Sequence, residues 1–408
     1  MKALVLCGGV PQAELIKQLR EREIKAILVD MNEKAPAVSV ADKFYAVSTM
    51  DVEGIKNVVL KENVDFLITV CADQMILVVA EVSELFGLPC YITYDTAQKV
   101  SSKELMKQVF VENGVPTSKH VVMAAFKKKL IGGLKYPLIV KPVDSYSSRG
   151  VNKVLEEGQL KTAFDEAVCV SRTNTAIVEE FVEGQELTVD VYVEDGKAHV
   201  LCISSLDKIP GNSKFVIQRC VCPADISVNT AEMIGEVCQR IAEAFELMNT
   251  PMLVQLITDD NRISVVEFCA RTGGGDKFRL IKQMTGFDVV KAVLDLTVGK
   301  KPHVEIKDAN KYIVDEFLYC NPGIFDHLEG FDELVDEGVI DEYYQLKNPG
   351  TEVGNISSSS DRVAYFTIID EDYENLRKRH CVISKRIKIM SNTGEDILRH
   401  DLIQNIGR

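Results

Sequence analysis

The feature that most constrains the fold is an alternation of short apolar runs and helical patterns at the start of the chain. Residues 2–7 (KALVLC) form an apolar run that ends at a pair of glycines. A helical pattern follows, with Leu15 and Leu19 on one face, and Ile24–Val29 forms a second apolar run. This order of strand, tight turn, helix and strand predicts the opening of a parallel α/β sheet.

The same alternation returns further along the chain. It predicts a strand at Asp65–Cys71, a helix at Gln74–Phe86 and a strand at Pro89–Thr93. We therefore predict a small doubly wound domain over residues 1–95. The glycine pair at positions 8 and 9 lacks the G-x-G-x-x-G pattern of dinucleotide sites, so it is either a tight turn or a point of ligand approach.

Composition excludes several classes of protein. A chain of 408 residues suggests two or three domains, and a formal net charge of -14 argues against a nucleic-acid surface. No apolar run approaches the length of a membrane span and no export signal is visible, so we expect no membrane partner and a cytoplasmic location. The 11 cysteines are scattered, and the pair Cys220 and Cys222 has no second pair of metal ligands nearby in sequence.

The middle of the chain reads as mixed helix and strand. Its patterns predict helices at Ser102–Asn113, Glu157–Val170, Asn229–Phe245 and Asp276–Thr285, and strands at residues 136–142, Ala176–Phe181, Glu186–Glu194, Lys197–Ser204, Met252–Thr258 and Arg262–Cys269. Residues 205–222 read as a loop-rich segment, and residues 306–408 as a mixture of strands and helices.

One stretch, Val265–Asp276 (VVEFCARTGGGD), joins a strand to three glycines. Glu267 and Arg271 are its charged residues before the glycines, and alternation places them on one face of the strand. A buried carboxylate needs a partner. The partner is either a cation of the protein, which makes a structural ion pair, or a divalent metal ion.

Other polar features lie at the ends of predicted elements. Lys103 opens a helix, Lys141 ends a strand, and the loop Asp144–Gly150 is short and polar. The strand end Glu179–Val182 (EEFV) is followed by Glu186. Lysines neutralise phosphate oxygens and loop amides cradle them, so this set suits a metal-bound triphosphate.

The order and spacing of these residues resemble the ATP-grasp superfamily, over roughly residues 1–305. The resemblance implies an ATP-grasp domain at residues 96–305 made of two α+β subdomains that hold ATP, with a lid at about 116–184, and a smaller C-terminal α+β domain at 306–408. It implies ATP and Mg²⁺ as cofactors, with Glu267 and Gln255 at the metal and with Arg271 and Lys141 in catalysis. The ATP-binding residues that it implies are Lys103, Lys141, Ser145, Ser147, Ser148, Glu179, Glu180, Phe181, Val182 and Glu186.

Two positions depart from the family pattern. Cys269 stands where the family has an asparagine, and Gln255 where it has the first metal carboxylate. Cysteine is a poor Mg²⁺ ligand and glutamine offers only a neutral oxygen, which puts a second metal ion in doubt. Asp276 is a further candidate for the missing oxygen.

The resemblance implies an ADP-forming ligase that joins a carboxylate, expected to be that of an amino acid, to an amine through an acyl phosphate. It also implies a homodimer. We expect Arg271, Gly273, Gly274, Arg279 and Asp73 to bind the substrate, although Asp73 can also be read as a helix N-cap. Further candidate cations are Lys208, Lys214, Arg219 and Lys277. Two alternatives stay open: another ATP-grasp phosphotransferase or carboxylase, and a nucleotide-binding module without turnover.

Overall fold

The computed structural model describes residues 1–145, 148–211, 215–307, 309–403 and 406. The chain begins with a four-stranded parallel sheet in the order β3-β2-β1-β4. Alternate residues of β1 pack into different cores, Ala3 and Val5 on the side of α1, and Leu4 and Leu6 on the side of α2 and α3. Burial on both faces is typical of a parallel sheet between helices and confirms the doubly wound domain. Its elements are β1 (Lys2–Leu6), α1 (Val10–Glu21), β2 (Lys25–Asp30), β3 (Lys43–Ala46), α2 (Val52–Glu62), β4 (Phe66–Ile68) and α3 (Asp73–Phe86).

One strand predicted for this domain is wrong. Residues 89–93 form no strand and lead instead into α4 (Tyr94–Ser101). Pro89 cannot donate a ladder hydrogen bond, and Ile92 is the one residue of this short segment that is buried. The fourth strand of the sheet is β3, whose half-exposed residues give little sequence signal.

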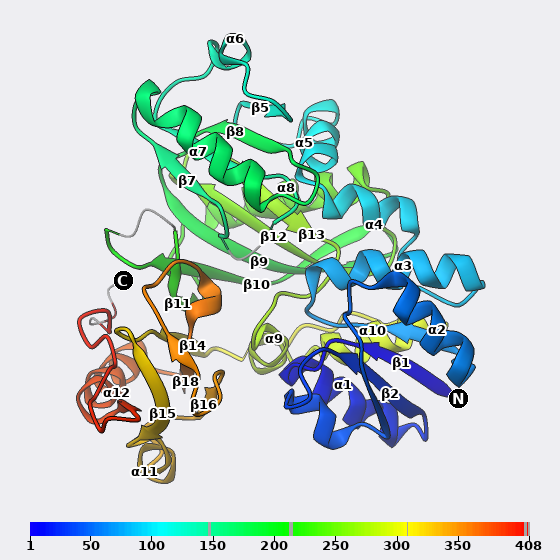
Figure 1. Cartoon of the computed structure of the whole chain (residues 1–408), viewed down its shortest axis with the longest axis vertical. Helices are drawn as coiled ribbons and strands as arrows, with labels where there is room; N and C mark the ends of the chain where they lie inside the picture. The colour runs from blue at the N-terminus through cyan, green and yellow to red at the C-terminus, as the bar shows by residue number, and fades with distance from the viewer. Residues whose placement is uncertain (146–147, 212–214, 308, 404–405, 407–408) are drawn as a thin grey trace.

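The segment predicted to form the lid folds into a second four-stranded sheet, in the order β5-β8-β6-β7 with antiparallel pairing throughout, and is called the lid below. The helix α7 lies across it at the top of the view in Figure 1. Leu160 and Phe164 of α7 pack against Leu138 and Val178 of the sheet, so the lid has a hydrophobic core of its own. Its elements are β5 (His120–Met123), α6 (Lys128–Ile131), β6 (Leu138–Pro142), β7 (Asn152–Val154), α7 (Glu157–Val170) and β8 (Ala176–Glu180), and α5 (Lys103–Glu112) precedes it.

The centre of the molecule is an eight-stranded sheet in the order β13-β12-β9-β10-β11-β14-β18-β16 (Figure 1). Its first five strands come from the middle of the chain, and the segment predicted to be loop-rich supplies part of them. There β10 continues to Lys208 and β11 spans Ile217–Cys222. The polar residue Arg219 is accommodated in β11 because it pairs with Glu316 of the neighbouring strand. The elements are β9 (Gln185–Glu194), β10 (Lys197–Lys208), β11, α8 (Val228–Ala244), β12 (Thr250–Thr258), β13 (Ile263–Cys269), α9 (Lys277–Thr285) and α10 (Val289–Thr297).

The C-terminal segment continues the central sheet and adds a small sheet in the order β17-β15-β19. The strand β14 pairs with β11, so strands from the middle of the chain and strands from its C-terminal part belong to one hydrogen-bonded sheet. This α/β architecture confirms the predicted fold class. The remaining elements are β14 (Tyr312–Leu318), β15 (Gly323–Glu329), α11 (Phe331–Asp336), β16 (Glu342–Gln345), β17 (Glu352–Val353), β18 (Ala364–Asp370), α12 (Tyr373–Arg386) and β19 (Lys388–Ser391), with short 3-10 turns at Pro36–Val40 and Ser359–Asp361. Among the helices described, none combines the length and the apolar character that a membrane crossing requires.

Candidate active site

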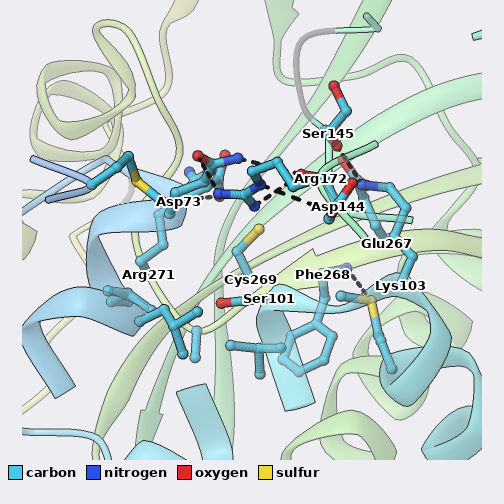
Figure 2. A pocket seen from close by; sticks show the side chains of 17 residues that line it. Asp73, Ser101, Lys103, Asp144, Ser145, Arg172, Glu267, Phe268, Cys269 and Arg271 are labelled. Carbon is cyan, nitrogen blue, oxygen red and sulfur yellow. Dashed lines mark hydrogen bonds and ion pairs between the residues drawn. The ribbon is translucent and has the colours of Figure 1, made fainter. Parts of the chain in front are cut away.

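A pocket lies where the end of β13 meets α3, the start of α5 and the loop that follows β6 (Figure 2). The space around it, including the open solvent at its mouth, is about 640 Å³. Glu267, Cys269 and Arg271 all line it, as their alternation in the strand predicted. Lys103, Asp73 and Ser145 line it as well, so five of the predicted site residues meet here, together with Cys269.

Lys103 joins three elements of the pocket. Ser102 caps α5 by accepting a hydrogen bond from the amide of Leu105, and this places Lys103 in the first turn. Its Nζ lies 3.0 Å from Oε2 of Glu267 and donates to the carbonyl of Ser145 at 2.7 Å. Burial opposes ionisation of Glu267, but the ammonium groups of Lys103 and Lys141 hold the pKa of this carboxyl below its usual value.

Asp73 and Arg271 form an ion pair between the N-terminal domain and the end of β13. Nε of Arg271 donates to Oδ1 of Asp73 at 2.6 Å, and Nη2 donates to the same oxygen. Despite its burial, the pKa of Arg271 is raised by the Asp73 carboxylate. The N-cap of α3 is Ala72, so the alternative reading of Asp73 as an N-cap is wrong. Asp73 instead holds the guanidinium of Arg271.

Lys141 and Glu179 form a buried cluster beside the pocket, together with Lys107. Oε1 of Glu179 lies 2.7 Å from Nζ of Lys141, and Oε2 of Glu179 lies 3.2 Å from Nζ of Lys107. Although burial opposes it, these two ammonium groups hold the pKa of Glu179 far below its usual range. Burial lowers the pKa of Lys107 to about 8. The sequence analysis missed Lys107, whose place one turn after Lys103 on the same helix face is its one signal.

The segment Glu179–Val182, which the resemblance assigns to ATP binding, lies at the end of β8. The amide of Phe181 donates to the carbonyl of Pro137 at 2.9 Å, whereas the amide of Val182 makes no backbone hydrogen bond within the described residues. The Phe181 ring is covered by Nζ of Lys153 at 3.5 Å from its centroid and lies near the Phe215 ring. A strand end with an unused amide beside an aromatic ring suits a flat heterocycle.

Glu186 and Gln255 lie on the neighbouring strands β9 and β12. Oε1 of Glu186 accepts hydrogen bonds from Nζ of Lys208, at 2.7 Å, and from Nε2 of Gln255. Gln255 pairs in register with Glu267. The two predicted metal residues are therefore cross-strand neighbours, and Lys208 is engaged by Glu186 rather than exposed to solvent.

The glycine turn after β13 is tightly packed at its first glycine, Gly273. A Cβ at Gly273 would come within 2.8 Å of the Lys277 side chain and 3.2 Å of Oδ1 of Asp190, so this position requires glycine. A Cβ at Gly274 would make only an ordinary contact, at 3.7 Å from the carbonyl of Cys71. Lys277 is itself buried, and its Nζ lies 3.3 Å from Oδ2 of the buried Asp190.

The structure does not bring Arg279 to the pocket at β13. Nη1 of Arg279 lies 2.8 Å from Oε2 of Glu342 in β16 and 3.4 Å from Oδ2 of Asp276. Arg279 lines a second, smaller pocket. Asp276 lines that second pocket too, and not the first. Ser148 donates to the carbonyl of Phe215. Ser147 and Lys214 lie outside the described residues.

The sequence analysis also missed two residues that line the first pocket, Gln74 and Arg172. Gln74 follows Asp73 on α3, and Arg172 lies in the turn after α7. Neither belongs to a motif in the sequence: Gln74 reaches the pocket from α3, beside Asp73, and Arg172 reaches it from the lid.

These features define a class: an α/β protein with a charged pocket between a lid sheet, an antiparallel sheet and a parallel N-terminal domain. The sequence profile of the ATP-grasp domain matches residues 134–278, and that of the PylC-like N-terminal domain matches residues 4–90. The chain therefore contains an ATP-grasp domain, preceded by a PylC-like N-terminal domain.

Its relatives are distant. The chain is 27% identical over 284 residues to the formate-dependent phosphoribosylglycinamide formyltransferase of Sulfurisphaera tokodaii, covering 66% of this chain and 70% of that protein. It is 20% identical over 330 residues to the multifunctional protein ura1 of Schizosaccharomyces pombe, covering 78% of this chain. That match spans only 14% of the length of ura1.

Solved structures share the fold over nearly the whole chain. The L-amino acid ligase from Bacillus licheniformis superposes with a TM-score of 0.81 at 18% identity, covering 96% of this chain and 98% of that one. The phosphoribosylglycinamide synthetase from Anaerococcus prevotii superposes with a TM-score of 0.74 at 21% identity, covering 96% of this chain and 99% of that one.

Proposed function

We propose that the protein is an ADP-forming ligase that joins a carboxylate to an amine through an acyl phosphate. The observation that supports this most is the meeting of Lys103, Glu267 and Arg271 in one pocket, with Lys103 also bonded to Ser145 of the loop after β6. A cation, a carboxylate and a loop at one point suit a metal-bound polyphosphate. The names of the relatives, which include an L-amino acid ligase, agree with this chemistry.

The residues present fit Mg²⁺ brought in with a nucleotide. Glu267 is 29% exposed at the pocket and offers one carboxylate, and Gln255 beside it offers an amide oxygen. Mg²⁺ takes one or two carboxylates and completes its shell with phosphate oxygens and water. Within the described residues no group of three or more His, Cys, Asp or Glu could hold a metal ion. The fit is therefore to a metal that shares its ligands with ATP phosphates, whose charge it would neutralise.

The chain's own residues have distinct tasks in this proposal. Lys103 and Lys141 neutralise phosphate oxygens, and Arg271 stabilises the charge on the phosphoryl group in transit. The substrate carboxylate oxygen attacks the γ-phosphorus and ADP leaves. The amine nitrogen then attacks the acyl carbon, phosphate leaves, and the nitrogen loses a proton as the amide forms.

The acid substrate is proposed to be an amino acid. Its carboxylate would lie near Arg271 and the turn at Gly273 and Gly274, next to the start of α9, where backbone amides favour an anion. A homodimer is part of the proposal, since one solved neighbour, the biotin carboxylase domain of a Hydrogenobacter thermophilus carboxylase, is a dimer. Light scattering tests that state directly.

The experiment that tests the function is ADP release from ATP and Mg²⁺ with pooled amino acids as acids and amines. Glu267→Gln keeps the size of the side chain and removes its charge, and Glu337→Gln is a matched control because Glu337 pairs with Arg386 far from the pocket. ADP that requires the pool, is lost in Glu267→Gln and persists in Glu337→Gln supports the ligase. Nucleotide binding without any ADP release contradicts it and favours a binding module, the reading that the departures at Gln255 and Cys269 support.

A further inference from the structure

The cations of the first pocket differ in how their charge is balanced. Lys103 lies 3.0 Å from the Glu267 carboxylate, and its side chain is 14% exposed. Arg271 is bonded to Asp73 and is 8% exposed. Arg172 lines the same pocket, but its side chain is 50% exposed and its nearest approach to a carboxylate is 3.9 Å, from Nε to Oδ2 of Asp144. Of the three cations, Arg172 is therefore the most exposed and the one whose positive charge is least balanced by a carboxylate, so an anionic ligand can pair with it most readily.

The guanidinium of Arg172 is held by neutral oxygens. Nη2 donates to the backbone carbonyl of Asp144 at 3.1 Å, and Nη1 donates to Oε1 of Gln74 at 3.3 Å. Gln74 in turn donates through Nε2 to the Asp144 carbonyl at 3.4 Å. Figure 2 shows Arg172 beside Asp144 at the pocket. Neutral partners orient a guanidinium without cancelling its charge, which leaves it suited to an anion.

The backbone that carries Arg172 is fixed against the loop after β6. The carboxylate of Asp144 accepts the amide of Thr173 at 3.0 Å, and the amide of Val143 donates to the carbonyl of Thr175 at 3.3 Å. The Asp144 carboxylate is thus used in holding the turn, and its interaction with Arg172 is weak at 3.9 Å. The turn after α7 therefore presents Arg172 to the pocket in a defined position.

We propose that Arg172, oriented by Gln74, forms an oxyanion subsite of this pocket. The subsite binds either the terminal phosphoryl group of the nucleotide or the carboxylate of the acid substrate, whose oxygens offer a guanidinium the same chemistry. This inference rests on the proposed function. It also gives the lid a direct contact with the ligand, because Arg172 belongs to the lid and Gln74 to the N-terminal domain.

The test compares Arg172→Gln and Arg172→Lys with wild type in two measurements. The first is calorimetric binding, with Mg²⁺, of ADP and of a non-hydrolysable ATP analogue. The second is the concentration of the amino-acid pool that gives half-maximal ADP release. Arg240→Gln is the matched control, because Arg240 is an exposed arginine that also donates to a loop carbonyl, that of Gly114 at 2.8 Å, and does not line the pocket.

We expect Arg172→Gln to change one of the two measurements by roughly tenfold to hundredfold, since a charge-assisted hydrogen bond is removed. Either the affinity for the ATP analogue falls by this factor, or the half-maximal concentration of the amino-acid pool rises by it. Weaker binding of the ATP analogue with unchanged ADP binding assigns the subsite to the phosphoryl group. Unchanged nucleotide binding with a higher half-maximal pool concentration assigns it to the carboxylate. Arg172→Lys, which keeps the charge but not the fork of donors, falls between wild type and Arg172→Gln.

Where the wild-type protein binds nucleotide, two results overturn the subsite. One is a change of less than about threefold in both measurements; the other is an equal loss for ADP and the analogue together with a lower melting temperature, which indicates a structural role. A wild-type protein that binds neither nucleotide overturns the proposed function and the subsite together. Intact binding and turnover in wild type, with Arg172→Gln indistinguishable from it, overturns the subsite alone.

Discussion

The buried cluster of Glu179, Lys107 and Lys141 yields a prediction that is independent of any activity. Glu179→Gln removes one negative charge and leaves two ammonium groups without a carboxylate partner. The Lys107 side chain is 0% exposed and that of Lys141 is 7% exposed. Because both ammonium groups are buried, water cannot solvate them in place of the lost carboxylate. We therefore expect the variant to lose stability where the lid meets α5.

The expected loss is about 3–5 kcal/mol, the usual result of removing one partner from a buried ion pair. Lys107 can limit this loss by releasing its proton. Its pKa is already lowered from 10.5 to about 8 by burial, and without the attraction of Glu179 it falls further. Between that lower pKa and 10.5 the unfolded chain binds more protons than the folded one, so the stability of the variant rises with pH in this window.

Hydrogen exchange at the amides of β5 and β8 is the appropriate assay, because a chain with several domains has no single free energy of unfolding. A loss of about 3–5 kcal/mol makes exchange through local opening roughly a hundredfold to several thousandfold faster. Glu180→Gln is the control. Glu180 follows Glu179, is half-buried, and accepts one hydrogen bond from the amide of Lys135. Exchange in Glu179→Gln that is less than fivefold faster than in this control would refute the argument.

Two further predictions concern other carboxylates, one at the edge of the pocket and one buried in the central sheet. Asp73→Asn weakens the hold on Arg271, so we expect kcat for ADP release to fall about tenfold to hundredfold with little change in the KM for ATP; a higher KM with unchanged kcat would contradict the positioning role. Burial raises the pKa of Asp315 to about 6, from 3.8 in an exposed group. The folded protein then binds more protons than the unfolded chain between about pH 4 and 6, so stability falls by roughly 3 kcal/mol as pH rises through this window. Protection of the β14 and β18 amides against hydrogen exchange, taken relative to the intrinsic exchange rate at each pH, will show this slope in wild type and its loss in Asp315→Asn, whereas an equal slope in both proteins would count against this assignment.

The elements that could be predicted from the sequence are those with a strong local signal. The helix at Glu157–Val170 was predicted at its observed bounds, because its apolar residues repeat with helical spacing. The strand β3 was missed because its residues are half-exposed and show no alternation. The strand β11 was missed because it follows a segment that contains Pro210 and Gly211 and carries the charged Arg219, whose partner Glu316 lies 97 positions later. Pairing between distant segments leaves no local pattern.

The candidate site divides in the same way. The positions of Lys103 and Glu267 follow from a helix start and a strand end, which the sequence shows. The contacts between site residues, however, join distant parts of the chain. Asp73, for example, pairs with Arg271 across 198 positions. Arg172 had no signal, since its place at the pocket depends on how the lid packs. The roles of the site residues stay predictions until the variants are measured.

The carboxylates of the two clusters differ in exposure, and this difference separates their roles. Glu179 is 6% exposed at its side chain and is held by two lysines and by the hydroxyl of Ser118. A ligand that displaced it would leave buried cations behind, so its contribution is to position Lys141. Glu267 is 29% exposed, faces the pocket and has one close cation, Lys103. A polyphosphate can take over the charge of Lys103, and Glu267 is then free to face an incoming metal ion. A structure in which Lys103 stays bonded to Glu267 with nucleotide and Mg²⁺ bound would contradict this exchange of partners.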